Sequence, residues 1–245
     1  MMRARGFIVQ KQEESAADCQ DRFSINADTG SVAVSDGMSQ SLFPKYWAEI
    51  LADKYTSDED WVPSRDNVRA LAPLWKERVN ARLEELQRAG LATWRAENML
   101  AEGYSAGATL VGLRILANNH FVCDVLGDSC LVIIQDGRIM QIYCSMDDTA
   151  FDCYPDYYDS DPRKSGKGNI KTFYGEIAAG MQFLLVSDPL AEFIASFLGS
   201  GRERILVKEL LSVESQQEFE MLVGYWRQDG MHNDDTTMVM VWPQA

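Results

Sequence analysis

The order of helix-like and strand-like segments in the sequence predicts an α+β fold in which helices cover the faces of layered β-sheets. Alternating apolar and polar residues, which are typical of strands, occur near both ends of the chain and again in its middle. Amphipathic stretches with helical spacing separate these groups of strands. The chain has 245 residues, of which 46% are apolar, so it is long enough to bury a sizeable core.

The first half of the chain is expected to begin with strands and to continue with helices. A turn at Ala27–Gly30 joins two alternating runs into a hairpin. Pro73 lies near the start of the second helical stretch and is expected to break or kink it there. The expected strands are Gly6–Gln12, Asp21–Asn26 and Ser31–Asp36, and the expected helices are Leu42–Tyr55 and Asn67–Glu102.

The second half is expected to contain strands, a long loop and a group of helices. Ser145–Gly168 is rich in Asp and Tyr and has no periodicity, so we interpret it as a surface flap within one domain that spans residues 1–245. Helices are expected from Pro189 to Trp226. The expected strands are Ala108–Leu116, His120–Leu126, Cys130–Gln135, Arg138–Tyr143, Gln182–Ser187 and Thr236–Trp242.

The composition excludes several classes of function. A net charge of -14 argues against binding to nucleic acid or to an anionic membrane, because phosphate groups would be repelled. No apolar run approaches the roughly 20 residues that span a bilayer, and the apolar stretch at the start of the sequence is too short for a signal peptide. Coiled-coil heptads are also absent from the sequence. We therefore expect a cytoplasmic monomer.

The choice of catalytic side chains is narrow. The five cysteines form no C-x-x-C pair, which argues against a thiolate zinc site or a disulfide framework. Only two histidines, His120 and His232, are available for acid–base chemistry. Any catalysis is therefore expected to depend on carboxylates.

The first hairpin allows an explicit argument about register. If Ala27–Gly30 form a four-residue turn, Asp21 lies directly opposite Asp36, with Cβ atoms ~5 Å apart. Two like charges in that position destabilise a sheet unless a cation lies between them, which points to a divalent metal. The alternative is a register slipped by one residue, with both carboxylates in solvent. The same count pairs the apolar residues of the hairpin, Ile25 with Val32 and Phe23 with Val34.

Other aspartates also lie where apolar runs end or begin. Asp128 closes one strand-like run, Asp188 closes another, and Asp234 with Asp235 opens the last strand. Each has a plain alternative interpretation when taken alone. Asp128 could form a turn, and Asp188 or the preceding serine could cap a helix whose first turn contains Pro189.

Six segments follow one another in a fixed order: QDRF, AVSDGM, GYSAGATLVG, LGDSCLVIIQDG, FLLVSDPLAEF and NDDTTMVMV. Together they resemble the PP2C (PPM) family of metal-dependent Ser/Thr protein phosphatases, over nearly the whole chain from Gly6 to Trp242. The run Cys19-Gln20-Asp21 is similar to a bacterial PP2C-like subgroup. The resemblance implies a two-layer antiparallel β-sandwich flanked by helices, with a binuclear Mn²⁺ or Mg²⁺ centre at one end.

The resemblance also implies roles for particular residues. Asp21, Asp36, Asp188 and Asp234 fall on the catalytic, metal-binding aspartates, and Gly37 falls on a glycine whose carbonyl is also a ligand. Asp128 and Glu192 fall where some members hold a third ion. The implied reaction is hydrolysis of phosphoserine or phosphothreonine by metal-activated water, on a phosphorylated protein that is the target of a Ser/Thr kinase. The flap would lie beside the site.

Several positions depart from the family pattern. Gln20 replaces a Glu, and Ala16 or one of its neighbours stands where many members have a phosphate-binding Arg. Met38 replaces a His proposed as general acid in some members, and Asp235 replaces an Asn, an exchange also found in related bacterial regulatory phosphatases. Lys11 and Arg22 are the nearest basic residues that could substitute for that Arg. His232 could deliver a proton, although a plain loop histidine is the simpler interpretation. These departures leave open a second function, a catalytically weak PP2C-like module that binds a phosphoprotein without turnover.

Overall fold

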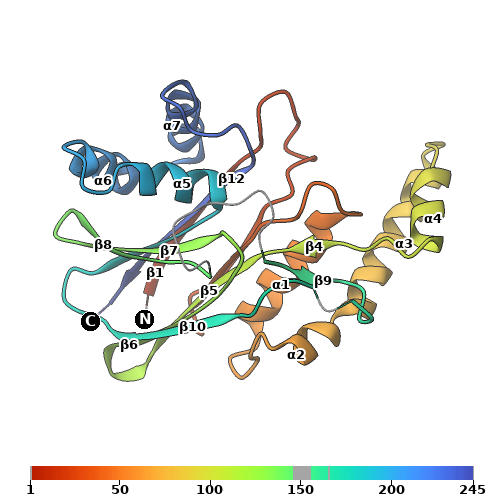
Figure 1. Ribbon diagram of the computed structural model, residues 1–245, viewed down its shortest axis with the longest axis horizontal. Helices are drawn as coiled ribbons and strands as arrows, with labels where there is room; N and C mark the ends of the chain where they lie inside the picture. The colour runs from red at the N-terminus through yellow and green to blue at the C-terminus, as the bar shows by residue number, and fades with distance from the viewer. Residues whose placement is uncertain (1, 146–155, 165, 245) are drawn as a thin grey trace.

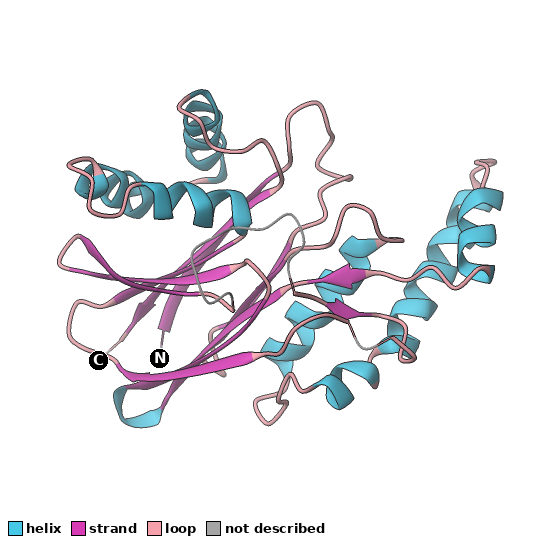
Figure 2. Ribbon diagram, in the orientation of Figure 1, coloured by secondary structure: helices cyan, strands magenta, loops and turns pink. Residues whose placement is uncertain are grey.

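Two five-stranded antiparallel sheets form the centre of the protein. The computed structural model describes residues 2–145, 156–164 and 166–244. Helices lie on the outer face of each sheet, so the layers run helix, sheet, sheet, helix (Figures 1 and 2). The expected α+β sandwich flanked by helices is therefore confirmed.

The first sheet joins the two ends of the chain. Its strand order is β1-β12-β11-β7-β8, with every neighbouring pair antiparallel. Pairing of β1 with β12 along eight residues ties the N-terminal strand to the C-terminal strand. The strands are β1 (Met2–Val9), β7 (Cys130–Gln135), β8 (Arg138–Tyr143), β11 (Gln182–Val186) and β12 (Thr236–Pro243).

The second sheet contains the predicted hairpin. Its order is β10-β6-β5-β3-β2, and a short two-stranded sheet, β4-β9, lies beside it. A 3₁₀ turn, η1 (Ala117–Asn119), joins β5 to β6. The strands are β2 (Arg22–Asn26), β3 (Ser31–Ser35), β4 (Gly107–Ala108), β5 (Leu110–Leu116), β6 (His120–Leu126), β9 (Tyr158–Asp159) and β10 (Lys171–Glu176).

The helices form two groups, one on each sheet. Buried apolar residues of α5 (Asp188–Ser196), α6 (Glu203–Ser212) and α7 (Gln216–Gln228) pack against the first sheet. Those of α1 (Pro44–Ser57), α2 (Arg65–Arg69) and α3 (Ala72–Arg88) pack against the second sheet, and α4 (Trp94–Ala101) follows α3. A third apolar cluster fills the space between the sheets. None of the helices in the described ranges is long and apolar enough to cross a membrane.

Two expectations about elements are wrong. The stretch Asn67–Glu102 is three helices: the expected break lies just before Pro73, and a second, unexpected break lies at Gly90, where φ is +74°. Strand β10 was not expected. This strand forms the edge of its sheet, and its side chains are only half-buried or exposed. Its sequence therefore lacks the clear alternation of apolar and polar residues that marks a half-buried strand.

The predicted flap Ser145–Gly168 is only partly described, since 146–155 and 165 lie outside the described residues. The described part is not simply a loop. It contains β9, whose Tyr158 is buried and donates a hydrogen bond to the Pro63 carbonyl, while the Tyr158 carbonyl accepts one from Trp47 Nε1 at 3.0 Å. This portion is part of the core, because an aromatic ring and its polar groups are both satisfied inside it.

Candidate active site

The hairpin has the register that places Asp21 and Asp36 at the same end. Phe23 pairs with Val34, and the last pair of the ladder is Arg22 with Ser35. Asp21 and Asp36 follow immediately as the next residues on the two strands. The slipped register is therefore excluded. The pairs Phe23–Val34 and Ile25–Val32 contribute to the apolar cluster between the sheets, as the alternation predicts.

Thr109 fixes the backbone at Asp36. The Asp36 N–H donates to Thr109 Oγ1 at 3.1 Å, and the Thr109 N–H donates to the Asp36 carbonyl at 2.9 Å. The same hydroxyl lies 2.9 Å from Ser129 Oγ, in the turn that carries Asp128. One buried threonine thus connects two of the segments that end in predicted site residues.

Gly37 is needed where it stands. It is buried and bridges Ala108, and a Cβ built on it would lie 2.9 Å from the Pro44 backbone and 3.0 Å from the Gln20 carbonyl. Real Cβ atoms are rarely so close to backbone atoms, so only glycine fits without a shift. The chain at Gly37 is therefore packed directly against the start of α1 and the segment before Asp21.

Asp188 is the first residue of α5. The preceding Ser187 does not cap this helix with its side chain; its hydroxyl accepts from the Thr237 N–H at 2.9 Å instead. A carboxylate in the first turn is favoured by the helix dipole. Asp128 is buried, with 4% of its surface exposed, in the turn after β6.

The charges of these side chains act on one another. Burial raises the pKa of Asp36 well above its usual value, and the charges of Asp21, Asp188 and Asp128 raise it further. For Asp188, burial again comes first among the causes of a strongly raised pKa, followed by the charges of Asp128, Asp21 and Asp234. We call Asp21, Asp36, Asp128 and Asp188 the aspartate cluster. Asp234 lies at its border, with a third of its side chain exposed.

The two remaining members of the cluster have moderately raised values. Burial raises the pKa of Asp21 to about 7, although a hydrogen bond from Thr237 acts in the opposite direction. Burial raises the pKa of Asp128 to about 6. The raised pKa values of these four aspartates indicate a site that lacks a compensating positive charge.

The donor set suits a hard divalent cation. Oδ1 of Asp21 and Oδ1 of Asp128 are buried and have no hydrogen-bond partner among the described residues. Buried carboxylate oxygens without partners are costly, and Mg²⁺ or Mn²⁺ prefers such oxygen ligands. Within the described ranges, however, no group of three or more His, Cys, Asp or Glu side chains is placed so that it could already hold an ion. The residues therefore fit a divalent cation by the type of their ligand atoms and by the two carboxylate oxygens that have no hydrogen-bond partner among the described residues.

The other predicted residues lie at the edges of the cluster. Glu192, one turn after Asp188 on α5, is exposed, so its role as a ligand stays a prediction. His232 is exposed too, two residues before Asp234. Arg22 turns its guanidinium back to the carbonyls of Cys19 and Asp21, whereas Lys11 Nζ lies 3.8 Å from Asp234 Oδ1. Of the two basic candidates, only Lys11 points its charge to the border of the cluster.

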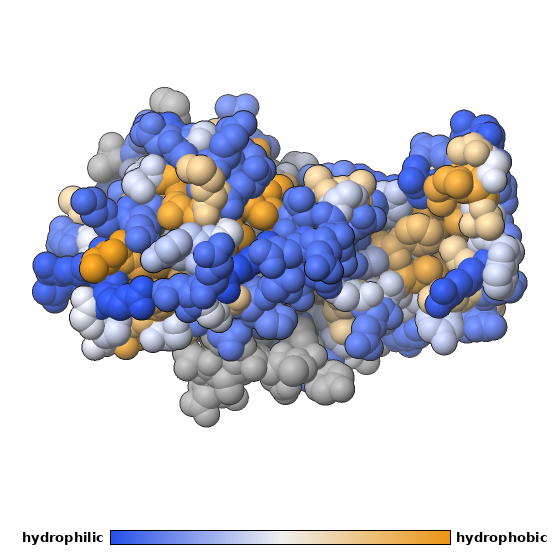
Figure 3. Space-filling view, turned by 90° about the horizontal axis from the view of Figure 1, so that it is seen from above, coloured by the Kyte–Doolittle hydropathy of each residue, from blue (hydrophilic) through white to orange (hydrophobic). Residues whose placement is uncertain are grey.

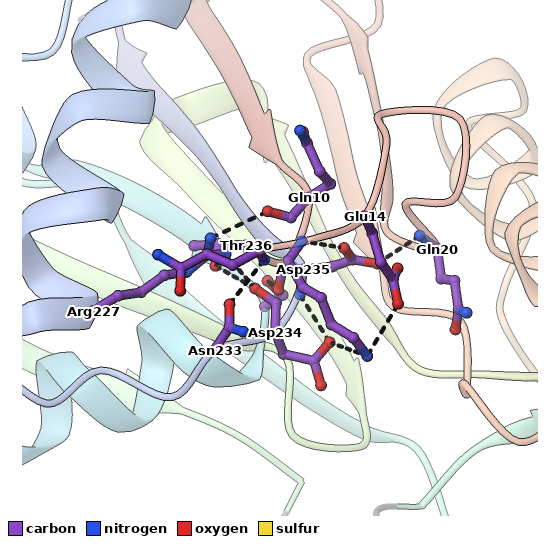
Figure 4. A network of polar contacts seen from close by, with 11 residues as sticks. Gln10, Glu14, Gln20, Arg227, Asn233, Asp234, Asp235 and Thr236 are labelled. Atoms are coloured by element: carbon purple, nitrogen blue, oxygen red, sulfur yellow. Dashed lines mark hydrogen bonds and ion pairs between the residues drawn. The ribbon is translucent and has the colours of Figure 1, made fainter.

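Sequence reasoning missed the groups that hold the cluster in place. Thr237 on β12 donates to Asp21 Oδ2 at 2.7 Å, and Asp235 accepts hydrogen bonds from the backbone on both sides of the loop before Asp21. Figure 4 shows this second network around Asp234 and Asp235. The sequence does signal two acids in a row before the last strand, but it cannot tell which one faces the cluster.

A separate apolar cleft lies at the α3–α4 end of the molecule. It has a volume of about 640 Å³ and is lined by residues of α3, α4 and the segment 160–163, with no aspartate of the cluster among them. Figure 3 shows apolar side chains gathered around a hollow at this end. A second cavity, of about 420 Å³, shares Gly103, Tyr104 and Ser105 with the cleft and reaches Met38, next to Gly37.

Comparisons with known proteins identify the fold. No protein-family model matches the sequence, and neither does any curated protein. Solved structures do. The catalytic domain of the serine/threonine protein phosphatase PstP, in complex with two manganese ions, is 18% identical with a TM-score of 0.59, over 98% of this chain and 97% of that one. The serine/threonine phosphatase of S. agalactiae is 12% identical with a TM-score of 0.58, over 100% of both chains.

A further similar structure is PppA of Pseudomonas aeruginosa, described as a key regulatory component of T6SS. It is 15% identical with a TM-score of 0.57, over 98% of this chain and 96% of that one. These likenesses extend over essentially the whole chain. The protein thus has the fold of the bacterial PP2C-type Ser/Thr phosphatases, and the resemblance indicated by the six motifs is confirmed at the level of fold.

Proposed function

We propose that the protein is a Mn²⁺- or Mg²⁺-dependent phosphatase that hydrolyses phosphoserine or phosphothreonine in proteins. The observation that carries the proposal is the aspartate cluster: four carboxylates from four separate segments, mutually repelling, with two buried oxygens unpartnered. The manganese ions of the PstP catalytic domain, which has the same fold, support the same class of metal.

Asp21, Asp36, Asp128, Asp188 and Asp234 would hold the ions, with Gly37 and Glu192 as further candidate ligands. Two such ions, when bound, would supply Lewis acidity and lower the pKa of water for attack on phosphorus. The residues of the chain supply the rest. Thr237 orients the Asp21 carboxylate, Thr109 fixes the backbone of Asp36, and both do so before any ligand arrives.

Lys11 is the cation that we expect to contact the phosphoryl group of the substrate. Its ammonium lies between Asp234 and Glu14, at 3.8 Å and 3.5 Å, and about a third of the side chain is exposed. The charges of Asp234 and Glu14 raise the pKa of Lys11, which keeps it positive at neutral pH. An accessible positive charge at the border of an acidic cluster can attract a dianionic ester.

The test measures phosphate release from a phosphoserine peptide and from p-nitrophenyl phosphate, with Mn²⁺ and with a chelator. We expect hydrolysis of both substrates only when Mn²⁺ is present. Mn²⁺-dependent binding of the phosphopeptide without phosphate release would favour the alternative of a binding module without turnover. If the protein neither binds the phosphopeptide nor releases phosphate, the proposal is wrong.

A further inference from the structure

One side chain closes both ends of the loop that leads into Asp21. Residues 10–20 connect β1 to β2 and contain no helix or strand. The Asp235 carboxylate accepts from the Lys11 N–H at 2.9 Å through Oδ1 and from the Gln20 N–H at 2.7 Å through Oδ2. Asp235 itself is 7% exposed. We call these two hydrogen bonds the Asp235 clamp.

The clamp acts together with Thr237, the second residue of β12, which lies two positions after Asp235. Asp235 holds the backbone of Gln20, and Thr237 holds the carboxylate of the next residue, Asp21. Thr237 engages only Oδ2, so Asp21 Oδ1 is the oxygen left without a partner. Asp235, which directly precedes β12, and Thr237, on β12, thus set both the position and the orientation of one predicted ligand.

Arg227 of α7 links the start of β12 to the segment that follows β1. Its guanidinium donates to the carbonyls of Gln10 at 3.2 Å and Asp234 at 2.6 Å, and to Thr236 Oγ1 at 3.3 Å. Figure 4 shows Arg227 reaching from the helix toward Gln10 and Asp234. The clamp therefore rests on a support that is itself fixed to the N-terminal segment.

The chemistry of the clamp requires a carboxylate. Two backbone N–H donors need two acceptor oxygens, and a carboxylate supplies both. An asparagine would offer one oxygen and turn an N–H₂ group toward the other donor, leaving that part-buried N–H without this acceptor. Asp234 and Asp235 are therefore not equivalent, although they are adjacent and identical.

We propose that Asp235 is a positioning residue: it aligns Asp21 for the metal and Lys11 for the phosphoryl group without contacting either ligand. This inference rests on the proposed function, because the metal ion and the phosphoryl group are the ligands of that function. Its geometric part, the closing of the 10–20 loop, stands on the hydrogen bonds alone.

The experiment compares the full chain with its Asp235→Asn variant. The matched control is Asp229→Asn, which also removes one carboxylate oxygen from a hydrogen bond, here to Arg202 at 2.7 Å, on the outer surface. Amide hydrogen exchange at Lys11 and Gln20 is followed by NMR in the metal-free protein. The Kd for Mn²⁺ is measured by the electron paramagnetic resonance signal of the free ion.

We expect Asp235→Asn to speed exchange at Gln20 or Lys11 about tenfold and to weaken Mn²⁺ binding by about 10-fold to 100-fold, as is usual for groups that orient metal ligands. Asp229→Asn should change neither. If Asp235→Asn does not fold, Thr237→Val and Thr237→Ser replace it: the valine should weaken Mn²⁺ binding about tenfold, and the serine should retain it.

Unchanged exchange in Asp235→Asn would overturn the clamp. Faster exchange with an unchanged Kd for Mn²⁺ would overturn the positioning role, because the loop would then be irrelevant to Asp21. If the unaltered chain binds no Mn²⁺ at all, the proposed function fails, whereas the exchange result still decides whether Asp235 closes the loop.

Discussion

The aspartate cluster and the Asp235 clamp lie at the same end of the sandwich and both consist of aspartate side chains. The carboxylates have opposite hydrogen-bonding states in the two places. In the clamp, both oxygens of Asp235 accept hydrogen bonds from backbone N–H groups. In the cluster, Asp21 and Asp128 each keep a buried oxygen without a partner among the described residues, and burial raises the pKa of both carboxyls. A satisfied carboxylate stabilises the fold, whereas an unsatisfied one is a cost that a bound cation can offset.

This difference separates residues that build the site from residues that would act in it. Substitutions in the cluster should reduce activity and spare stability, and substitutions in the clamp and its support should reduce stability as well.

The largest effect is expected for Asp36→Ala. Loss of a ligand should lower phosphatase turnover in saturating Mn²⁺ by at least about 100-fold, since each factor of ten corresponds to only about 1.4 kcal/mol of transition-state stabilisation. The metal-free variant should be at least as stable as the parent, because one charge leaves a repulsive group. Asp28→Ala, in the exposed turn of the same hairpin, serves as control. Near-normal turnover in Asp36→Ala would show that the cluster is not the catalytic centre.

The second prediction concerns pH. In the folded chain the pKa of Asp21 is raised to about 7 and that of Asp128 to about 6, whereas both should lie near 4 in the unfolded chain. The folded state therefore binds these protons more tightly, and the stabilisation that this gives is complete below about pH 4.

The free energy of unfolding of the metal-free protein should accordingly fall as the pH rises from about 4 to about 7, by about 1.4 kcal/mol for each unit of pKa shift. Urea denaturation in the presence of a chelator measures it. Saturating Mn²⁺ should abolish the fall. A free energy that stays level or rises across this window would contradict the raised pKa values.

The third prediction tests the support of the clamp. Arg227→Met leaves the carbonyls of Gln10 and Asp234 without their donor, which should cost about 1–3 kcal/mol of unfolding free energy. Arg202→Met is the matched control: its pair with Asp229 is on the surface, so the loss should stay below about 1 kcal/mol. Equal losses in the two variants would mean that Arg227 is an ordinary surface residue.

The smallest effect is expected for His232→Ala. The side chain is exposed, and the described hydrogen bond at this residue uses its carbonyl rather than its ring. Phosphoserine hydrolysis should stay within about twofold of the parent, the usual range for surface substitutions. A hundredfold loss with the phosphoserine peptide, and none with p-nitrophenyl phosphate, would instead identify His232 as the proton donor.

The α+β layering and the hairpin follow from local rules, whereas the two-layer sandwich was implied by the resemblance of the six motifs. The turn at Ala27–Gly30 determines the register, and strand alternation then determines which side chains face the other sheet. Local rules predict the break at Pro73 in Asn67–Glu102 but were insufficient for the one at Gly90, where the amphipathic pattern continues across the break. They were also insufficient for Lys171–Glu176, since an edge strand buries too little to show a clear period.

The sequence indicates which aspartates belong to the candidate site, but it does not indicate the hydrogen bonds that hold them in place. Asp21, Asp36, Asp128 and Asp188 are recognisable at the ends of strands. The hydrogen bonds of Asp235 to Lys11 and Gln20 join residues more than 200 positions apart, and nothing in the sequence around either partner signals the other. Such contacts follow only from the three-dimensional arrangement of β1, β2 and β12.

The pairing of β1 with β12 also has a consequence for the order in which the protein is made. Asp21 is synthesised long before the groups that hold it, because the hydrogen bonds between Asp235 and Gln20 and between Thr237 and Asp21 span 215 and 216 positions. Long-range pairings of this kind form late, after the intervening chain has closed into a loop. The end of the sandwich that carries the aspartate cluster therefore stays unassembled until β12 has emerged and docked, so the charge repulsion of the cluster arises only when folding is nearly complete.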